Sequence, residues 1–190
     1  MLLQIIIIST RKGRLGPAVG DWFYRLAQAF DGFDVELVDL AEVNLPLLDE
    51  PHHPRLANYQ HEHTKRWSSI VSRADAFVFV TPEYNFSTPP SLVNALDYLS
   101  KEWAYKPAAF VSYGGISGGT RSVMMTKSIL TTLRMMPIFE AVNLPMFTQQ
   151  IDRATGEFNA TELNEKAADA MLKELHKWAE ALGTMRDGNK

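Results

Sequence analysis

Runs of apolar residues alternate with amphipathic stretches along the whole sequence. Residues 2–8 form an apolar run rich in isoleucine and without period-two alternation, which is typical of a strand buried on both faces of a parallel sheet. After Pro17, apolar residues recur at the three- and four-residue spacing of a helix that buries one face. These patterns predict a strand, a polar loop and a helix at the start of the chain.

The same alternation continues towards the end of the sequence. Further strands are predicted at residues 33–40, 74–80, 106–113 and within 137–147. Further helices are predicted over residues 57–73, 91–103, 120–134 and 163–182. For the last of these helices, Asn159 and Glu162 resemble a capping box, and the apolar stripe that starts at Leu163 ends before Gly183.

Five strands separated by helices predict an α/β fold. The expected architecture is a doubly wound parallel sheet with helices on both faces, because crossovers between parallel strands are right-handed. We expect one domain over residues 1–185 and a disordered tail at residues 186–190. Ligands of such sheets bind beyond the carboxyl ends of the strands. Three unusual loops, residues 9–16, 81–90 and 113–120, fall at that edge, so we expect the functional site there.

The first of these loops, residues 9–16, combines hydroxyls, cations and the amides of a helix N-terminus. That combination suits a phosphate monoester, to which arginine can add bidentate contacts. The loop has neither the P-loop spacing, G-x-x-x-x-G-K-[ST], nor the dinucleotide spacing, G-x-G-x-x-G. A mononucleotide is therefore the predicted ligand, and the alternative is a solvated basic turn that caps the helix.

The second loop, residues 81–90, follows its strand with acid, phenol, amide and proline residues. Prolines stiffen the backbone, while Tyr84, Asn85 and Phe86 offer an aromatic face and an amide that can pair with the edge of a heterocycle. The loop has no histidine, and Glu83 has no second carboxylate nearby in sequence for acid and base chemistry. The alternative is a structural connection with Tyr84 in a dimer interface.

The third loop contains paired glycines between residues 114 and 119. Glycine lets the backbone approach a flat or anionic group, and backbone amides can donate to that group. The segment also matches G-x-S-x-G, so a hydrolase with Ser117 as nucleophile is an alternative. Such a triad needs a later acid and a later histidine, and His176 on the closing helix is the only histidine that follows. A flexible turn is the remaining alternative.

Composition narrows the choice of partners. The formal net charge is -3, so no basic field attracts nucleic acid or an acidic membrane, and we expect neither as a partner. The absence of cysteine excludes disulfides and thiol chemistry and fits a cytoplasmic location. We expect residues 2–8 to be a strand rather than a signal peptide. The histidines at positions 52, 53, 61 and 63 are expected to be solvated, and no metal site is predicted.

Residues 82–97 carry the most specific motif of the chain. They match the pattern P-E-Y-N-x-S-x-P-x-x-L-x-N-A-[LI]-D. The phosphate loop S-x-R-x-x-R-x-G precedes this motif and the paired glycines follow it. In these features the sequence resembles the NADPH-dependent FMN reductases of the flavodoxin-like fold, which include quinone, azo and chromate reductases, and the similarity spans residues 2–183. It implies a five-stranded parallel sheet in the order 2-1-3-4-5.

The resemblance implies an FMN site built from the three loops. The residues implied to bind the phosphate are Ser9, Arg11, Arg14, Leu15 and Gly16. Those implied to line one side of the isoalloxazine are Pro82, Glu83, Tyr84 and Asn85. Those implied to approach its other edge are Tyr113, Gly114, Gly115 and Ser117. Many members carry serine or asparagine late in the phosphate loop, where this chain has Gly16 and Pro17, so Arg14 is the expected substitute.

Under this resemblance the protein is an FMN-dependent NAD(P)H oxidoreductase. Hydride would pass from NADPH or NADH to FMN, and two electrons would then reach a small-molecule acceptor such as a flavin or quinone in a ping-pong cycle. The amides of the glycine loop would stabilise negative charge near flavin N1, and no side chain would act as acid or base. A homodimer or homotetramer is also implied, with Trp103, Tyr105 and the methionine-rich helix after residue 120 as interface candidates. The alternatives are a flavodoxin-like electron carrier, which the mild charge disfavours, and a regulatory domain that binds a nucleotide without turnover.

Overall fold

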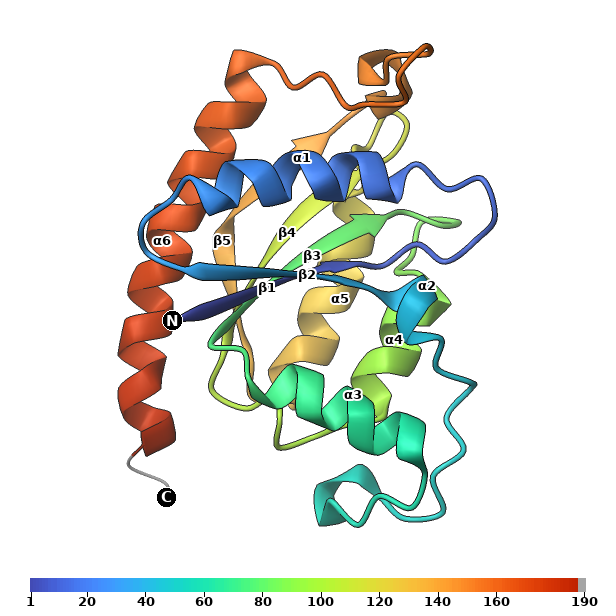
Figure 1. The fold of residues 1–190 in the computed structure, drawn as a ribbon, viewed down its shortest axis with the longest axis vertical. Helices are drawn as coiled ribbons and strands as arrows, with labels where there is room; N and C mark the ends of the chain where they lie inside the picture. Colours follow the sequence, from blue (N-terminus) through green and yellow to red (C-terminus); the bar gives the residue numbers. More distant parts are fainter. Residues whose placement is uncertain (188–190) are drawn as a thin grey trace.

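The computed structural model describes residues 1–187 and shows a five-stranded parallel sheet with helices on both faces (Figure 1). The strands are β1 (Leu2–Ile7), β2 (Asp34–Asp39), β3 (Ala76–Pro82), β4 (Pro107–Tyr113) and β5 (Met136–Leu144). Their order in the sheet is β2-β1-β3-β4-β5, and every neighbouring pair is parallel. This confirms the flavodoxin-like prediction, including the strand order 2-1-3-4-5.

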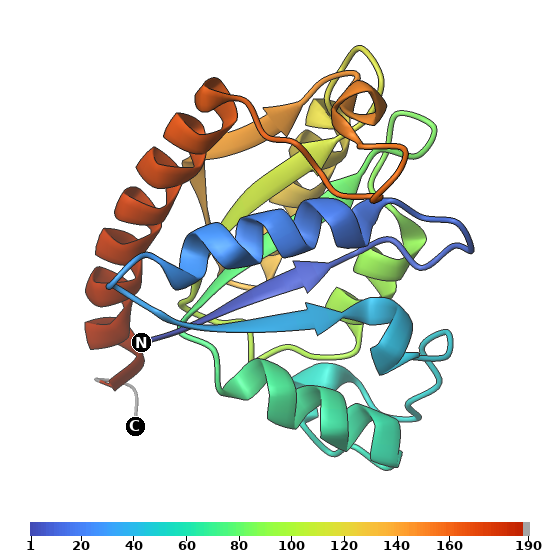
Figure 2. The ribbon, with the colours of Figure 1, turned by 45° about the horizontal axis from the view of Figure 1, so that its top comes forward.

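The helices form two layers. The α-helices are α1 (Gly16–Gln28), α2 (Leu40–Val43), α3 (Glu62–Ser72), α4 (Pro90–Asp97), α5 (Thr120–Thr132) and α6 (Glu162–Asp187). There are also two short 3-10 helices: η1 (Pro54–Leu56) lies between α2 and α3, and η2 (Phe147–Gln150) lies between β5 and α6. Helices α1 and α6 cover one face of the sheet, and α3, α4 and α5 cover the other (Figures 1 and 2).

The central strands β3 and β4 are largely apolar because the sheet is buried on both faces there, whereas the edge strands β2 and β5 also carry charged and exposed residues. In β3, Val78 and Val80 pack towards α1 and α6, whereas Phe77 and Phe79 pack towards α3, α4 and α5. Every residue of β3 and β4 is buried. These two central strands therefore hold the position of any loop that follows them.

The closing helix differs from its prediction at both ends. Thr161, not Asn159, caps it: the Asn164 amide donates to the Thr161 hydroxyl at 3.3 Å, and the Thr161 amide donates to the Asn164 side-chain oxygen at 2.9 Å. Leu163, the first residue of the predicted apolar stripe, is 75% exposed, whereas Met171 and Leu175 of the same stripe are buried as predicted. Gly183 does not end the helix, since glycine inside a helix costs only about 1 kcal/mol and later contacts offset that cost.

Those contacts come from Arg186, in the last turn of α6. Its guanidinium donates to Asp75 at 2.7 Å and to the carbonyl oxygen of Tyr105 at 2.9 Å. The prediction of a disordered tail is therefore wrong for residues 186 and 187, which belong to α6, while residues 188–190 lie outside the described part of the chain. That one domain spans residues 1–185 stays a prediction.

The segment between β2 and α3 is held by side-chain hydrogen bonds. His63 Nε2 lies 2.9 Å from the Asp49 carboxylate, and the Tyr98 hydroxyl donates to the same oxygen at 2.9 Å. The His61 ring stacks on His63. These two histidines are thus half-buried and bonded rather than solvated, whereas those at 52 and 53 are exposed as predicted. Within residues 1–187 no helix is long and apolar enough to cross a bilayer, and no cluster of three or more potential metal-binding side chains occurs.

Lys106 is a buried cation just before β4. Its ammonium group donates to the carbonyl oxygens of Val71 and Ser72, at 2.9 Å and 3.2 Å, and lies 5.5 Å from the centre of the Phe77 ring. Burial, with a smaller contribution from nearby Arg186, lowers the pKa of Lys106 to about 8. The folded protein therefore releases this proton at a lower pH than the unfolded chain does.

Lys106→Met is expected to remove one component of the dependence of stability on pH. Between about pH 8 and pH 10.5 the unfolded wild-type chain binds the Lys106 proton more tightly than the folded protein does, so the free energy of unfolding gains up to about 3 kcal/mol as pH rises. The variant should lack this gain, which urea unfolding across that range measures. Lys173→Met, at an exposed lysine, is the control, and an identical pH slope in wild type and Lys106→Met would contradict the prediction.

Candidate functional site

A cavity of about 210 Å³ lies at the carboxyl ends of β1, β3 and β4. It is lined by Ser9, Arg11, Arg14, Leu15, Pro82, Glu83, Tyr84, Tyr113, Gly114, Gly115, Met146, Phe147 and Thr148. All of these except Met146, Phe147 and Thr148 belong to the site predicted from sequence. Figure 2 shows the loops after β1, β3, β4 and β5 at the same edge of the sheet. The parallel strands therefore bring the three predicted loops together.

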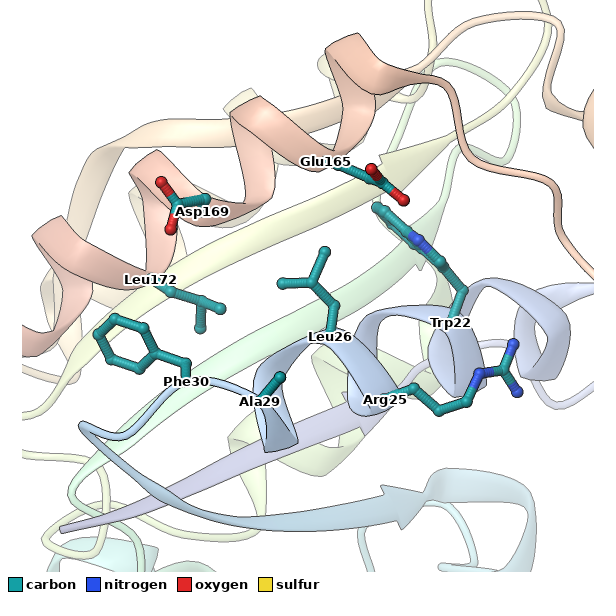
Figure 3. Close-up of a pocket in the computed structure, with 8 residues that line it drawn as sticks. All are labelled: Trp22, Arg25, Leu26, Ala29, Phe30, Glu165, Asp169 and Leu172. Carbon is teal, nitrogen blue, oxygen red and sulfur yellow. The ribbon is translucent and has the colours of Figure 1, made fainter.

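A larger cavity, of about 540 Å³, lies between α1 and α6 (Figure 3). Its walls include the apolar side chains of Trp22, Leu26 and Phe30, with the carboxylates Glu165 and Asp169 at the α6 side. None of its lining residues comes from the carboxyl ends of the strands. We therefore place the functional site in the smaller cavity, where polar groups from several loops converge.

The phosphate loop leads into α1 without a side-chain cap. Leu15 precedes the helix and offers no capping oxygen, and Pro17 occupies the first turn. The amides at this helix end thus lack a side-chain acceptor, which is the arrangement that anions use. Arg11 lines the cavity and is exposed, and its guanidinium makes only a long contact, 3.4 Å, with the carbonyl oxygen of Lys12.

Arg14 lines the cavity but is bound to the protein itself. Its two terminal nitrogens donate to both oxygens of Asp39, each at 2.7 Å, and one of them also donates to the carbonyl oxygen of Ser9 at 2.8 Å. The hydrogen bonds to Asp39 raise the pKa of Arg14, against the opposing effect of burial. Arg14 therefore ties the loop to the end of β2, and its charge is balanced before any ligand binds.

Two hydroxyls at this end of the cavity are buried without a partner. Ser9 is 1% exposed and Tyr113 is 4% exposed, and neither hydroxyl has a hydrogen-bond partner of acceptable geometry among the described residues. A Cβ atom on Gly16 would lie 2.2 Å from the Ser9 hydroxyl and 2.6 Å from that of Tyr113. Gly16 thus does not face the cavity, but its lack of a side chain makes room for both hydroxyls. The residues present fit an anionic group such as a phosphate.

The turn after β3 aims Asn85 away from the cavity. Tyr84 and Ser87 exchange two backbone hydrogen bonds, and Asn85 and Phe86 have φ angles of 50° and 65°. Two consecutive left-handed residues make a type I′ turn, a conformation that asparagine tolerates. Asn85 therefore forms the tip of a turn next to Tyr84, and it does not line the cavity. The resemblance to FMN reductases had implied that it does.

Glu83 joins the second loop to the third. One of its oxygens accepts from the Ser117 hydroxyl at 2.9 Å and from the Arg121 amide at 3.1 Å, and the other accepts from Arg121 Nε at 2.7 Å. Burial alone would raise the pKa of Glu83, but these donors outweigh burial and lower it. The Arg121 guanidinium also lies 3.7 Å from the centre of the Phe86 ring. Ser117 is thus bonded to Glu83 and does not line the cavity.

This network corrects the hydrolase alternative and adds a residue that sequence reasoning missed. Ser117 is bonded to Glu83. His176 instead packs against Phe33, the residue directly before β2, with ring centres 5.3 Å apart. The structure therefore does not assemble a triad. Arg121 was missed because it lies in the first turn of α5, where the expected helix carried no functional motif; its place directly after the glycine loop was the available signal.

The glycine loop is anchored to the turn after β5. The amide of Met146 donates to the carbonyl oxygen of Gly115 at 2.9 Å, and the amide of Gly114 donates to that of Leu144 at 3.3 Å. These bonds bring residues 146–148 to the cavity. Residues 146–148 match no sequence motif. The sequence indicated their place at the cavity only in that β5 is a further parallel strand that ends at the same edge of the sheet. A Cβ on Gly115 would meet nothing within 4 Å, so this position opens onto free space.

Comparisons with known proteins identify the family of the chain. The family model described as NADPH-dependent FMN reductase matches residues 1–149. An NAD(P)H-dependent FMN reductase of Schizosaccharomyces pombe is 41% identical over 146 residues, covering 75% of this chain and 73% of that protein. Another, from Nectria sp., is 30% identical over 195 residues, covering 92% and 96%.

A solved structure extends the likeness to the whole fold. The flavoenzyme NAD(P)H:(acceptor) oxidoreductase FerB from Paracoccus denitrificans has a TM-score of 0.75 and 21% sequence identity, covering 95% of this chain and 97% of that one. The strand order, the three loops and the family match lead to one assignment. The chain belongs to the NADPH-dependent FMN reductase family, a group of oxidoreductases that use FMN and NAD(P)H.

Proposed function

We propose that this protein passes reducing equivalents from NAD(P)H, through FMN held in the cavity, to a second small-molecule acceptor such as a flavin or quinone, in a ping-pong cycle. The observation that carries the proposal is the two-ended character of the cavity. One end holds an uncapped helix N-terminus, Arg11 and two buried hydroxyls; the other is walled by Tyr84, Pro82 and bare glycine backbone. A mononucleotide matches these two ends, because it has an anionic phosphate at one end and a planar heterocycle at the other.

The phosphate end favours an anion by charge and by hydrogen bonding. Arg11 supplies a cation that is not neutralised by an ion pair in the described chain, and the helix end of α1 adds partial positive charge. Arg14 holds the loop in place through Asp39. In this proposal Leu15 and Gly16 present backbone amides to the phosphate.

The ring end favours a flat ligand that needs no side-chain acid or base. When bound, FMN accepts hydride from NAD(P)H and returns two electrons to the acceptor. Gly115 leaves space for a ring to approach the backbone, whose amides can stabilise negative charge. The carboxylate of Glu83 is held ionised by Ser117 and Arg121, so it has no proton to give near neutral pH.

A homodimer or homotetramer and a cytoplasmic location are also part of the proposal. Met124 and Met125 on α5 are 68% and 52% exposed, and this supports an interface on that helix. Trp103 is 1% exposed and packs against Phe77 in the core. It is therefore not at the surface, where a subunit interface would form.

The spectrum of the flavin tests the proposed reaction directly. Purified protein with added FMN should lose its flavin absorbance on anaerobic addition of NADPH or NADH and recover it when a quinone is added. Bound FMN that neither nicotinamide nucleotide bleaches would indicate an electron carrier or a regulatory domain. Failure to bind FMN would refute the proposal.

Gly115→Val tests where the ring lies. The side chain should fit the protein, because nothing surrounds the Cβ position, but it should occupy the space of the ring. We expect FMN binding to weaken by at least about tenfold, or about 1.4 kcal/mol, with little change in the unfolding temperature of the ligand-free protein. Flavin fluorescence and thermal unfolding measure the two effects. Gly183→Ala in α6 controls for glycine replacement, and undiminished FMN binding by Gly115→Val would place the ring elsewhere.

Glu83→Gln tests the link between the two loops. We expect the free energy of unfolding at pH 7 to fall by about 1–3 kcal/mol, because charged hydrogen bonds to Arg121 and Ser117 are weakened. The pKa of Glu83 is lowered in the fold, so the difference from wild type should be complete above pH 4.5 and shrink as pH falls below it. Urea unfolding at several pH values measures this. Glu174→Gln, at a helix-surface ion pair, should change little, and equal effects of both variants would contradict the argument.

A further inference from the structure

The phenol of Tyr113 points to the phosphate loop. Tyr113 ends β4, where it pairs in register with Pro82 of β3 and Leu144 of β5, and its ring centre lies 4.7 Å from that of Phe147. These contacts fix the ring. The hydroxyl reaches the start of α1, where a Cβ on Gly16 would lie 2.6 Å from it. The resemblance to FMN reductases had instead implied that Tyr113 lies beside an edge of the isoalloxazine.

This hydroxyl is a buried donor that the protein does not use. It has no hydrogen-bond partner of acceptable geometry among the described residues, and neither has the nearby hydroxyl of Ser9. An unpaired polar group out of contact with water destabilises the ligand-free fold, and a ligand that bonds to it when bound is one explanation for its presence. Burial raises the pKa of Tyr113, an effect that the Ser9 hydroxyl and the charges of Arg14 and Arg11 only partly offset, so the phenol keeps its proton.

Several groups of the phosphate loop are not available as donors to a ligand. Both terminal nitrogens of Arg14 are engaged by Asp39, and one of them also by the carbonyl oxygen of Ser9. Pro17 has no backbone N–H, and Gly16 has no side chain. The space that a side chain at position 16 would fill is taken by the hydroxyls of Ser9 and Tyr113. Tyr113 therefore places a donor beside the start of α1, where Gly16 offers no side-chain donor and Pro17 no backbone donor.

We propose that the Tyr113 hydroxyl donates a hydrogen bond to the phosphate of the bound mononucleotide, together with Ser9, and so makes the site select a phosphorylated flavin over riboflavin. This inference rests on the proposed function, which places FMN in the cavity. Both oxygens are out of contact with solvent in this structure, so the proposed contact requires the groups around them to rearrange when the phosphate enters. The contact comes from β4, outside the loop that carries the phosphate motif.

Tyr113→Phe tests the contact without using enzyme activity. Dissociation constants of FMN and riboflavin are measured on flavin-free protein by quenching of flavin fluorescence. We expect the variant to bind FMN about tenfold more weakly and riboflavin within about twofold of wild type. The unfolding temperature of the ligand-free variant should be unchanged or higher, because an unpaired buried hydroxyl has been removed. Tyr24→Phe, at a half-buried tyrosine on α1 that is bonded to Gln28, is the matched control.

Each other outcome has a definite meaning. Equal FMN affinity of wild type and Tyr113→Phe would overturn the inference while leaving the proposed function intact. An equal loss of FMN and riboflavin affinity would overturn the phosphate contact and place the hydroxyl elsewhere on the ligand. A lower unfolding temperature without flavin, with no selective loss of FMN affinity, would show a purely structural role and also overturn it. If wild type binds no FMN, the inference falls together with the proposed function.

Discussion

The site depends on the parallel register of the central strands. The Ile8 amide donates to the carbonyl oxygen of Val80, Pro82 lies opposite Tyr113, and Tyr113 lies opposite Leu144, so four consecutive strands of the sheet end at nearly the same level. In β3, the smaller Val78 and Val80 pack on one face and the larger Phe77 and Phe79 on the other, so a slip of one residue would exchange side chains of different size between the two cores and disrupt their packing. Loops that are far apart in sequence are thereby held around one cavity.

Charges around the cavity are largely paired within the protein. Arg14 is balanced by Asp39, and Arg121 by Glu83, so these ion pairs fix loop positions more than they attract a ligand. What remains for an anion is the exposed guanidinium of Arg11, the uncapped end of α1 and the buried hydroxyls. A site built in this way gains selectivity from geometry, because neutral donors recognise an acceptor only at hydrogen-bond distance.

Sequence reasoning was least accurate where tertiary contacts compete with local preference. Gly183 is a common helix terminator, but Arg186 binds Asp75 and carries α6 past it. Asn159 is a good cap in isolation, yet Thr161 and Asn164 bond each other and begin the helix two residues later. The histidines at 61 and 63 were expected in solvent and instead hold Asp49, a contact between segments that no local pattern encodes.

The sequence alone determined the strand and helix order, the parallel sheet and the three loops at its carboxyl edge, because hydrophobic periodicity and glycine or proline positions are local properties. Most residues that line the cavity followed from those loops. Only the tertiary structure showed that Arg14 is paired with Asp39, that Glu83 bridges to Ser117 and Arg121, and that residues 146–148 join the cavity. It also showed that the Tyr113 hydroxyl lies next to Gly16. These features depend on distances between segments separated by 25 to 100 or so residues, which are set by packing of the whole sheet rather than by any local pattern.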